Sequence, residues 1–183
     1  MTGSEYKAAD ALHEIEHTQQ RSAVTYGYRR SSPYLILWGV IWIVGYTGDY
    51  LRPNWWALWP ALIVLGIVAG FFFGGHTAAK GSRAEGWRYG ATAVMLFLFF
   101  WATFAVLPPK SGAEVGAFLP IFVGLCYSIY GIWARAARIL VLGLAVGVLT
   151  VGGYFYQPQY FLLWMAAVGG GALILGGLWL RGA

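Results

Sequence analysis

Two histidines one helical turn apart are the residues in this chain whose types and spacing best suit chemistry. They belong to the segment His13-Glu14-Ile15-Glu16-His17, which has the His-Glu-x-x-His spacing of zinc metalloproteases. That chemistry needs two imidazole ligands on one helix face and a glutamate beside them that activates the metal-bound water. The motif therefore raises two hypotheses, a zinc-dependent peptidase and a simpler metal-binding or regulatory site.

The sequence around this motif favours a third interpretation, a solvated helix face without metal. A zinc site needs a further ligand, for which His76 is the best candidate and Glu85 is another. A regulatory metal site would add Asp10 to the histidines. On a helical wheel His13 and His17 lie opposite the apolar stripe of their segment, so they face water rather than a cleft. The sequence therefore predicts no cofactor, with zinc at this motif as the alternative.

A second polar group lies near the end of the first apolar run and consists of Tyr46, Asp49 and Arg52. Asp49 and Arg52 are three residues apart and could pair on a helix, which would end the run with an interfacial ion pair. The alternative is that the three residues form the mouth of a polar pocket. They are therefore candidate ligand-binding residues.

The composition of the chain predicts a membrane protein. Of the 183 residues, 59% are hydrophobic and only 10% are charged, whereas a soluble domain carries roughly 25% charged residues. So few charges cannot cover a water-facing surface, and the lipid bilayer is the expected partner. The net charge of +5 does not indicate nucleic acid, because Lys and Arg lie in short segments between apolar runs and form no stripe.

Residues 1–32 are polar and predict a cytoplasmic amphipathic helix ahead of a membrane domain at 33–183. From Glu5 to Tyr28 the sequence has no proline and a single glycine, which favours one helix. Its weak apolar stripe suits contact with the membrane surface, with the loops of the bundle or with a cytoplasmic protein. The segment from Arg29 to Pro33 is expected to end this helix and to open the first membrane span.

Six apolar runs follow, each about as long as a spanning helix needs. They cover residues 34–50, 56–75, 89–107, 115–133, 139–154 and 160–180. All seven prolines lie at or near the ends of these runs, where a helix tolerates proline. The sequence thus predicts an all-α membrane protein with six transmembrane helices in a compact bundle.

The distribution of Lys and Arg predicts the orientation of this bundle. Ten of these residues lie on the side of the two chain ends, and only Arg52 and Lys110 lie on the other side. The positive-inside rule then places both termini of a multi-pass protein in the cytoplasm. An aromatic belt is expected at the outer interface, formed by Trp55, Trp56, Trp59, Tyr154, Tyr156, Tyr160 and Trp164.

A repeat and a glycine pattern bear on how the helices pack. Shifting the chain by 105 residues aligns the second run with the sixth, and shifting it by 60 aligns the second with the fourth more weakly. Three parallel hairpin repeats or chance similarity would both explain this. Gly66, Gly70 and Gly74 are spaced four apart, which lets helix backbones approach closely. We expect them to pack helices within one bundle, and the alternative is a homo-oligomer through glycine faces.

The polar residues within the runs limit the functions to be considered. No Asp, Glu, Lys or Arg lies deep within any run, which disfavours proton-coupled transport through carboxylates. The hydroxyl-bearing residues could line a pathway for a neutral solute or could bond to nearby backbone groups; they are Thr92, Thr103, Tyr127, Ser128, Tyr130 and Thr150.

The first functional hypothesis is therefore the binding or transport of a small neutral or lipid-like molecule. The alternative is a non-catalytic membrane sensor or scaffold whose N-terminal helix docks a cytoplasmic partner. The zinc-dependent peptidase built on His13 and His17 is the third hypothesis, because only the motif supports it.

Overall fold

The computed structural model describes residues 3–53, 57–75 and 83–182, with side chains from residue 22 onward apart from 23, 71, 73–75, 83–90 and 93. Every regular element in these ranges is a helix. The long helices are α1 (Gly3–Leu51), α2 (Leu58–Gly75), α3 (Arg83–Val106), α4 (Gly112–Trp133) and α5 (Ala137–Tyr156). The last helical stretch joins η1 (Pro158–Tyr160), α6 (Phe161–Trp164), the π-helical η2 (Met165–Gly170) and α7 (Gly171–Arg181).

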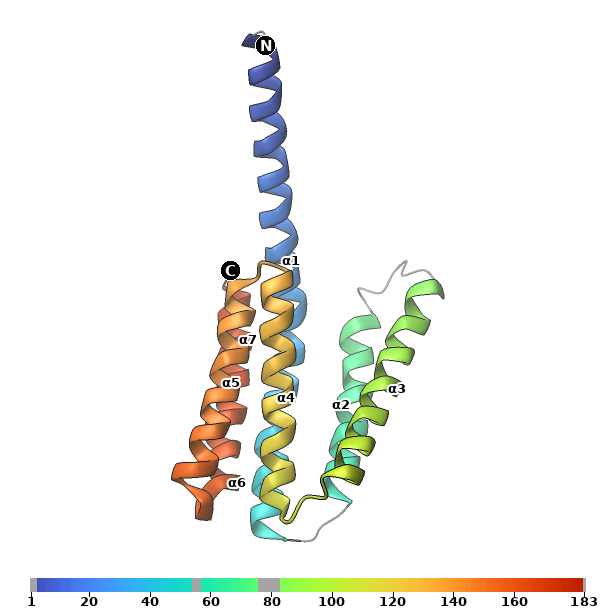
Figure 1. Ribbon diagram of the computed structural model, residues 1–183, viewed down its shortest axis with the longest axis vertical. Coiled ribbons are helices and arrows are strands. Elements are labelled where there is room, and N and C mark those ends of the chain that lie inside the picture. Colours follow the sequence, from blue (N-terminus) through green and yellow to red (C-terminus); the bar gives the residue numbers. More distant parts are fainter. Residues whose placement is uncertain (1–2, 54–56, 76–82, 183) are drawn as a thin grey trace.

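Successive long helices run in opposite directions (Figure 1). α1 packs against α7, η2 and α2, and α4 packs against α5. In the view of Figure 1, α3 lies near the N-terminal end of α4 and diverges from α4 toward the C-terminal end of α4. The N-terminal half of α1 projects beyond the other helices, and its contacts with the shared core begin at Val24 and Tyr28. The bundle therefore occupies only the second half of α1.

Four helical stretches in the described ranges are long and apolar enough to cross a bilayer, as judged by length and composition. They are Val24–Leu51, Gly112–Trp133, Ala137–Tyr156 and Pro158–Arg181. Shorter apolar segments, Leu58–Gly70 and Val94–Val106, lie within α2 and α3. Large apolar side chains such as Phe97 and Val148 are 69% exposed, and such a surface is better suited to contact with lipid than with water. The chain is thus all-helical and compatible with an integral membrane protein, while six spans and hairpin repeats stay predictions.

The expected end of the first helix between Arg29 and Pro33 is wrong, because α1 continues through Pro33 to Leu51. A proline inside a helix removes one backbone hydrogen bond, and such a helix persists where tertiary contacts hold both sides of it. Here Tyr28 and Leu35 are buried on either side, and the Ser32 hydroxyl donates to the Gly177 carbonyl of α7 at 2.7 Å. The predicted boundary between residues 32 and 33 therefore falls inside one helix.

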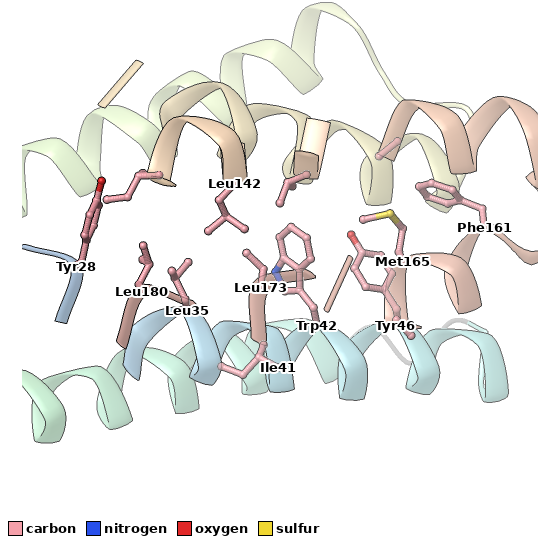
Figure 2. Packing of buried hydrophobic residues seen from close by; sticks show 14 of the residues in the cluster. Tyr28, Leu35, Ile41, Trp42, Tyr46, Leu142, Phe161, Met165, Leu173 and Leu180 are labelled. Atoms are coloured by element: carbon pink, nitrogen blue, oxygen red, sulfur yellow. The ribbon is translucent and has the colours of Figure 1, made fainter. Parts of the chain in front are cut away.

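The core lies where α1 meets α5 and the α6–α7 stretch (Figure 2). Its side chains alternate between α1 and the C-terminal helices along the bundle axis, and they include Tyr28, Leu35, Trp42, Tyr46, Leu142, Val146, Phe161, Met165, Leu173 and Leu180. All of these are buried. The α1 members are seven or four positions apart, which places them on one helix face, and burial of this face fixes the rotation of α1.

Two pairs of helices touch through glycine backbones. A Cβ added to Gly143 of α5 would lie 2.6 Å from the carbonyl oxygen of Gly124 on α4. A Cβ added to Gly39 of α1 would lie 2.8 Å from the carbonyl oxygen of Gly170 in η2. Real Cβ atoms do not approach so closely, so both contacts require glycine. The α4–α5 and α1–η2 pairs are therefore the most tightly packed parts of the bundle.

Candidate functional site

A cavity of about 360 Å³ lies between α1, α4 and α5 near the end at which α4 finishes. Its lining residues are Ser31, Tyr34 and Leu35 from α1, Cys126, Tyr127 and Tyr130 from α4, and Ile139 and Leu142 from α5. This volume falls within the usual range of small-molecule sites. The lining is apolar apart from hydroxyl and thiol groups, so it suits a molecule with an apolar body.

The periodicity of three helices brings these residues together. Each helix contributes residues one, three or four positions apart, which share a helix face. Ile139 and Leu142 are buried and form the inner wall, whereas Tyr130 is 55% exposed and Cys126 is exposed, so the cavity opens on the α4 side. The site is thus a recess of the bundle that is accessible from its surface.

Aromatic rings close the seam between α3 and α4 beyond one end of the cavity. Phe99 of α3 stacks on Phe122 of α4 with ring centroids 5.3 Å apart, and Phe104 meets Phe118 at 5.5 Å. Cys126 follows Phe122 by one helical turn, so the cavity begins where this ring cluster ends. In Figure 1 the ribbons of α3 and α4 diverge beyond the rings, toward the C-terminal end of α4.

The tyrosine hydroxyls differ in their hydrogen bonding. The Tyr34 hydroxyl donates to the Gly70 carbonyl of α2 at 3.2 Å, which fixes this ring between α1 and α2. Among the described residues, the hydroxyls of Tyr127 and Tyr130 have no hydrogen-bond partner. No buried side-chain nitrogen or oxygen of the described residues lacks a partner, so these two hydroxyls are accessible and can bond a ligand.

Three further hydroxyl-bearing residues of the spans bond to their own helices. Ser128 donates to Gly124 at 2.8 Å, Thr150 donates to Val146 at 2.7 Å, and Thr103 donates to Phe99 at 2.8 Å. In each case the acceptor is the backbone carbonyl four residues earlier. These three residues thus bond to nearby backbone groups, which is one of the two alternatives that the sequence left open. Such a bond satisfies a hydroxyl in an apolar helix without a partner on another helix.

The predicted ligand-binding residues Tyr46, Asp49 and Arg52 lie at the opposite end of α1 from the cavity. The buried Tyr46 hydroxyl donates to the Gly116 carbonyl at 2.7 Å, and the Asp49 carboxylate accepts from the Trp59 indole Nε1 at 2.5 Å. Tyr46 and Asp49 therefore tie α1 to α4 and α2. Among the described side chains no ion pair joins Asp49 to Arg52, which lies just beyond α1 and is exposed. A ligand at these residues stays a prediction.

The metal hypothesis concerns residues whose side chains the structure does not describe. The backbones of His13 and His17 lie one turn apart on α1, and His76 falls outside the described residues. No group of three potential metal-ligating side chains occurs in the described part of the chain. Zinc binding by the three histidines therefore stays a prediction.

The predicted packing glycines of α2 face α1 as far as the structure describes them. A Cβ on Gly66 would lie 2.7 Å from the Cδ1 atom of Ile41, and one on Gly70 would lie 3.4 Å from the Tyr34 ring. Both neighbours are side chains, so α2 stands further from α1 than α4 does from α5. The surroundings of Gly74 lie outside the described part. The geometry of Gly66 and Gly70 is that of packing within one chain.

No family model matches the chain, and the comparisons with curated proteins and with solved structures found no match. The site therefore has to be interpreted from its own chemistry. The sequence singled out Tyr127 and Tyr130 as polar residues of a span, but it did not indicate Ser31 and Tyr34 as their neighbours. The signal that was available is the spacing of Ser31, Tyr34 and Leu35, which continues the helical face of α1 across Pro33.

Proposed function

We propose that this protein binds a small neutral or lipid-like molecule within the membrane, in the cavity between α1, α4 and α5. The observation that carries this proposal is the pair of hydroxyls, on Tyr127 and Tyr130, that have no partner among the described residues at an otherwise apolar cavity. A ligand with an apolar body and one or two hydroxyl or carbonyl groups would satisfy both tyrosines.

The charge of the lining supports a neutral ligand. None of the eight lining residues is Asp, Glu, Lys, Arg or His. In a low-dielectric surrounding an ionic ligand group needs a counter-charge, and the lining supplies none. The exposure of Cys126 and Tyr130 on the α4 side of the cavity supports entry from the bilayer, because a lipid-like molecule reaches a membrane cavity through lipid.

In the proposed membrane arrangement, all six helical segments cross the bilayer and both termini are cytoplasmic. The alternating directions of the helices and the apolar segments of α2 and α3 support the six crossings. The ten Lys and Arg on the side of the chain ends, against Arg52 and Lys110 on the other, support the orientation. The cavity would then lie in the cytoplasmic half of the membrane, beside the middle of α1 and the last turns of α4.

The test is whether the tyrosine hydroxyls retain a ligand. Purified protein would be extracted with organic solvent and the extract analysed by mass spectrometry for neutral amphiphiles present in stoichiometric amounts. We expect the double variant Tyr127→Phe and Tyr130→Phe to lose the compound that the unmodified protein retains. Tyr156→Phe is the matched control, because Tyr156 is 85% exposed and lies at the far end of α5. Equal retention by both variants would contradict the proposal.

A second candidate function is the docking of a cytoplasmic protein by the N-terminal half of α1. The observation that favours it is the projection of this half beyond the bundle (Figure 1). An isolated helical segment is marginally stable in water, so a partner or a membrane surface would stabilise it. Deleting residues 3–20 should abolish cross-links to a cytoplasmic protein in intact cells and leave the midpoint of thermal unfolding of the bundle unchanged. Persisting cross-links would refute the docking role.

A further inference from the structure

The end of the bundle near the cavity carries a concentration of arginines from three parts of the chain. Arg29 and Arg30 belong to α1, Arg135 and Arg138 to the α4–α5 connection and the start of α5, and Arg181 to the last turn of α7. Contacts of Arg138 with Tyr28 and Trp179 and of Arg181 with Ser32 bring α1, α5 and α7 together here. We call this set the arginine end of the bundle.

Arg138 is held in a fixed position at the centre of this end. Its guanidinium carbon lies 5.2 Å from the ring centroid of Trp179 and 5.8 Å from that of Tyr28, distances at which a cation is attracted to an aromatic face. Its Nη1 atom donates to the Trp179 carbonyl at 2.9 Å, and its backbone N–H donates to the Tyr28 hydroxyl at 3.3 Å. These contacts order the side chain before any ligand arrives, which lowers the entropic cost of binding.

The guanidinium of Arg138 has N–H donors that are not engaged by the described part of the protein. An arginine side chain carries five N–H donors, and the structure shows one of them engaged by the Trp179 carbonyl. Arg181 is held in a similar way, because its Nε donates to the Ser32 hydroxyl at 3.0 Å, and its side chain is exposed. Planar forks of this kind match the oxygens of a phosphate group.

Among the described residues, no ion pair joins Arg138 or Arg181 to a carboxylate. The described Asp49 and Glu114 lie at the opposite end, where Asp49 bonds to Trp59 and Glu114 accepts from the Lys110 backbone at 2.6 Å. The nearest acidic residue on α1 before Tyr28 is Glu16, which lies roughly 18 Å away along the helix at 1.5 Å per residue. The N-terminus of α5 adds the positive end of its helix dipole, with no acidic residue in its first turn.

The connection between α4 and α5 adds a backbone observation. Arg135 has a φ of 52°, a left-handed conformation that residues other than glycine and asparagine rarely adopt. Glycine would occupy this position with less strain, yet an arginine is present.

From these observations we propose that the arginine end binds a phosphate group, with Arg138 as its central ligand and Arg181 beside it. A phosphate would satisfy the remaining donors of Arg138 and Arg181 and would neutralise their charges, which no described carboxylate pairs with. The same chemistry occurs in anionic phospholipid headgroups and in free phosphate. The site is separate from the cavity of the proposed function, which is lined by no charged residue.

Native mass spectrometry of the purified full chain would test this site with two lipids of identical acyl chains, phosphatidylglycerol and phosphatidylcholine. We expect preferential retention of phosphatidylglycerol, and Arg138→Gln should weaken it by about tenfold, the loss typical of a charge-assisted hydrogen bond. Arg138→Lys should weaken it less, because it keeps the charge. Arg52→Gln, at the opposite end, should have no effect. Equal retention of both lipids, or unchanged binding by Arg138→Gln, would overturn the proposal.

A measurement on the unmodified protein keeps the test independent of folding in the variants. The preference for phosphatidylglycerol should fall as salt is raised, because exposed charges are screened; a preference that salt does not change would refute the electrostatic site. Excess inorganic phosphate distinguishes the two sources. Displacement of the lipid by inorganic phosphate identifies a site for a free phosphate group, and retention of the lipid identifies a headgroup site.

Discussion

The Ser32 hydroxyl donates a 2.7 Å hydrogen bond to the Gly177 carbonyl and accepts one from Arg181, one residue before the proline at which α1 was expected to end. Ser32 is fully buried, so this contact couples the middle of α1 to the end of α7 in the interior of the bundle. A side chain of this kind can stabilise a helix that contains a proline, because its hydrogen bonds to another helix offset the backbone hydrogen bond that the proline removes.

Replacing Ser32 with alanine should therefore destabilise the bundle. The change removes two hydrogen bonds and leaves the Gly177 carbonyl without this donor, at a cost of about 1–3 kcal/mol. The midpoint of thermal unfolding in detergent would measure the loss. Ser22→Ala is the matched control, because Ser22 is exposed on the same helix. An equal effect of both changes would contradict the role assigned to Ser32.

Replacing Gly143 with alanine should separate α4 from α5. The added Cβ would stand 2.6 Å from both the Gly124 carbonyl oxygen and the Ser128 backbone nitrogen, atoms that cannot move without shifting a helix. Overpacking of this kind typically costs 1–3 kcal/mol, about the amount we expect as a loss of unfolding free energy. Gly152→Ala in the same helix should be neutral, since its Cβ would have no neighbour within 4 Å.

The glycines of α2 should respond more weakly than Gly143. At Gly66 the added Cβ would meet the Cδ1 atom of Ile41 at 2.7 Å, and this side-chain end can move aside. At Gly70 the nearest atom would be 3.4 Å away in the Tyr34 ring, which is ordinary contact. We expect the unfolding midpoint to fall in the order Gly143→Ala, Gly66→Ala, Gly70→Ala. A Gly70→Ala effect as large as that of Gly143→Ala would contradict the packing described.

Tyr46→Phe should loosen the contact between α1 and α4 without changing the shape of the core. The ring would keep its edge contacts with Trp42 and Trp59, at centroid distances of 6.0 and 5.1 Å, but would lose the bond to Gly116. One buried hydrogen bond is worth roughly 0.5–1.5 kcal/mol in unfolding free energy. Tyr50→Phe is the control, because Tyr50 is 41% exposed on the same helix. Equal effects would show that the bond to Gly116 contributes nothing.

Two substitutions at Asp49 separate its structural bond from the predicted ligand role. Asparagine keeps an oxygen that accepts from the Trp59 indole, so Asp49→Asn should leave stability within about 0.5 kcal/mol, whereas Asp49→Leu should lose the bond at a cost of roughly 1–2 kcal/mol. Chemical denaturation of both variants would measure this. If Asp49→Asn instead removes a bound compound while the fold is intact, the polar-pocket interpretation of Tyr46, Asp49 and Arg52 is supported.

Much of the fold could be predicted from the sequence because apolar runs, prolines and small residues are local signals. The predicted run 139–154 lies inside α5, and the predicted run 115–133 ends with α4 at Trp133. The continuity of α1 could not be predicted, since it depends on Ser32 meeting Gly177, a residue 145 positions away. A proline after two serines and two arginines resembles a helix end in any local analysis.

The candidate site was predicted only in part for the same reason. Tyr127 and Ser128 are neighbours in sequence and both bear hydroxyls, but Ser128 turns to the Gly124 carbonyl while Tyr127 lines the cavity. Which of them is available to a ligand depends on how α4 is rotated against α1 and α5. That rotation is set by the Gly124–Gly143 contact and the core of α1, neither of which a single sequence reveals.

The unbroken course of α1 gives the chain a mechanical property. A helix of 49 residues is about 74 Å long at 1.5 Å per residue, so it forms a single lever that extends from its free end into the bundle. Ser31 and Tyr34, which line the cavity, lie on the stretch of this lever nearest the projecting half. The projecting half of α1 is therefore continuous with one wall of the cavity, and a tilt of the whole helix would move that wall.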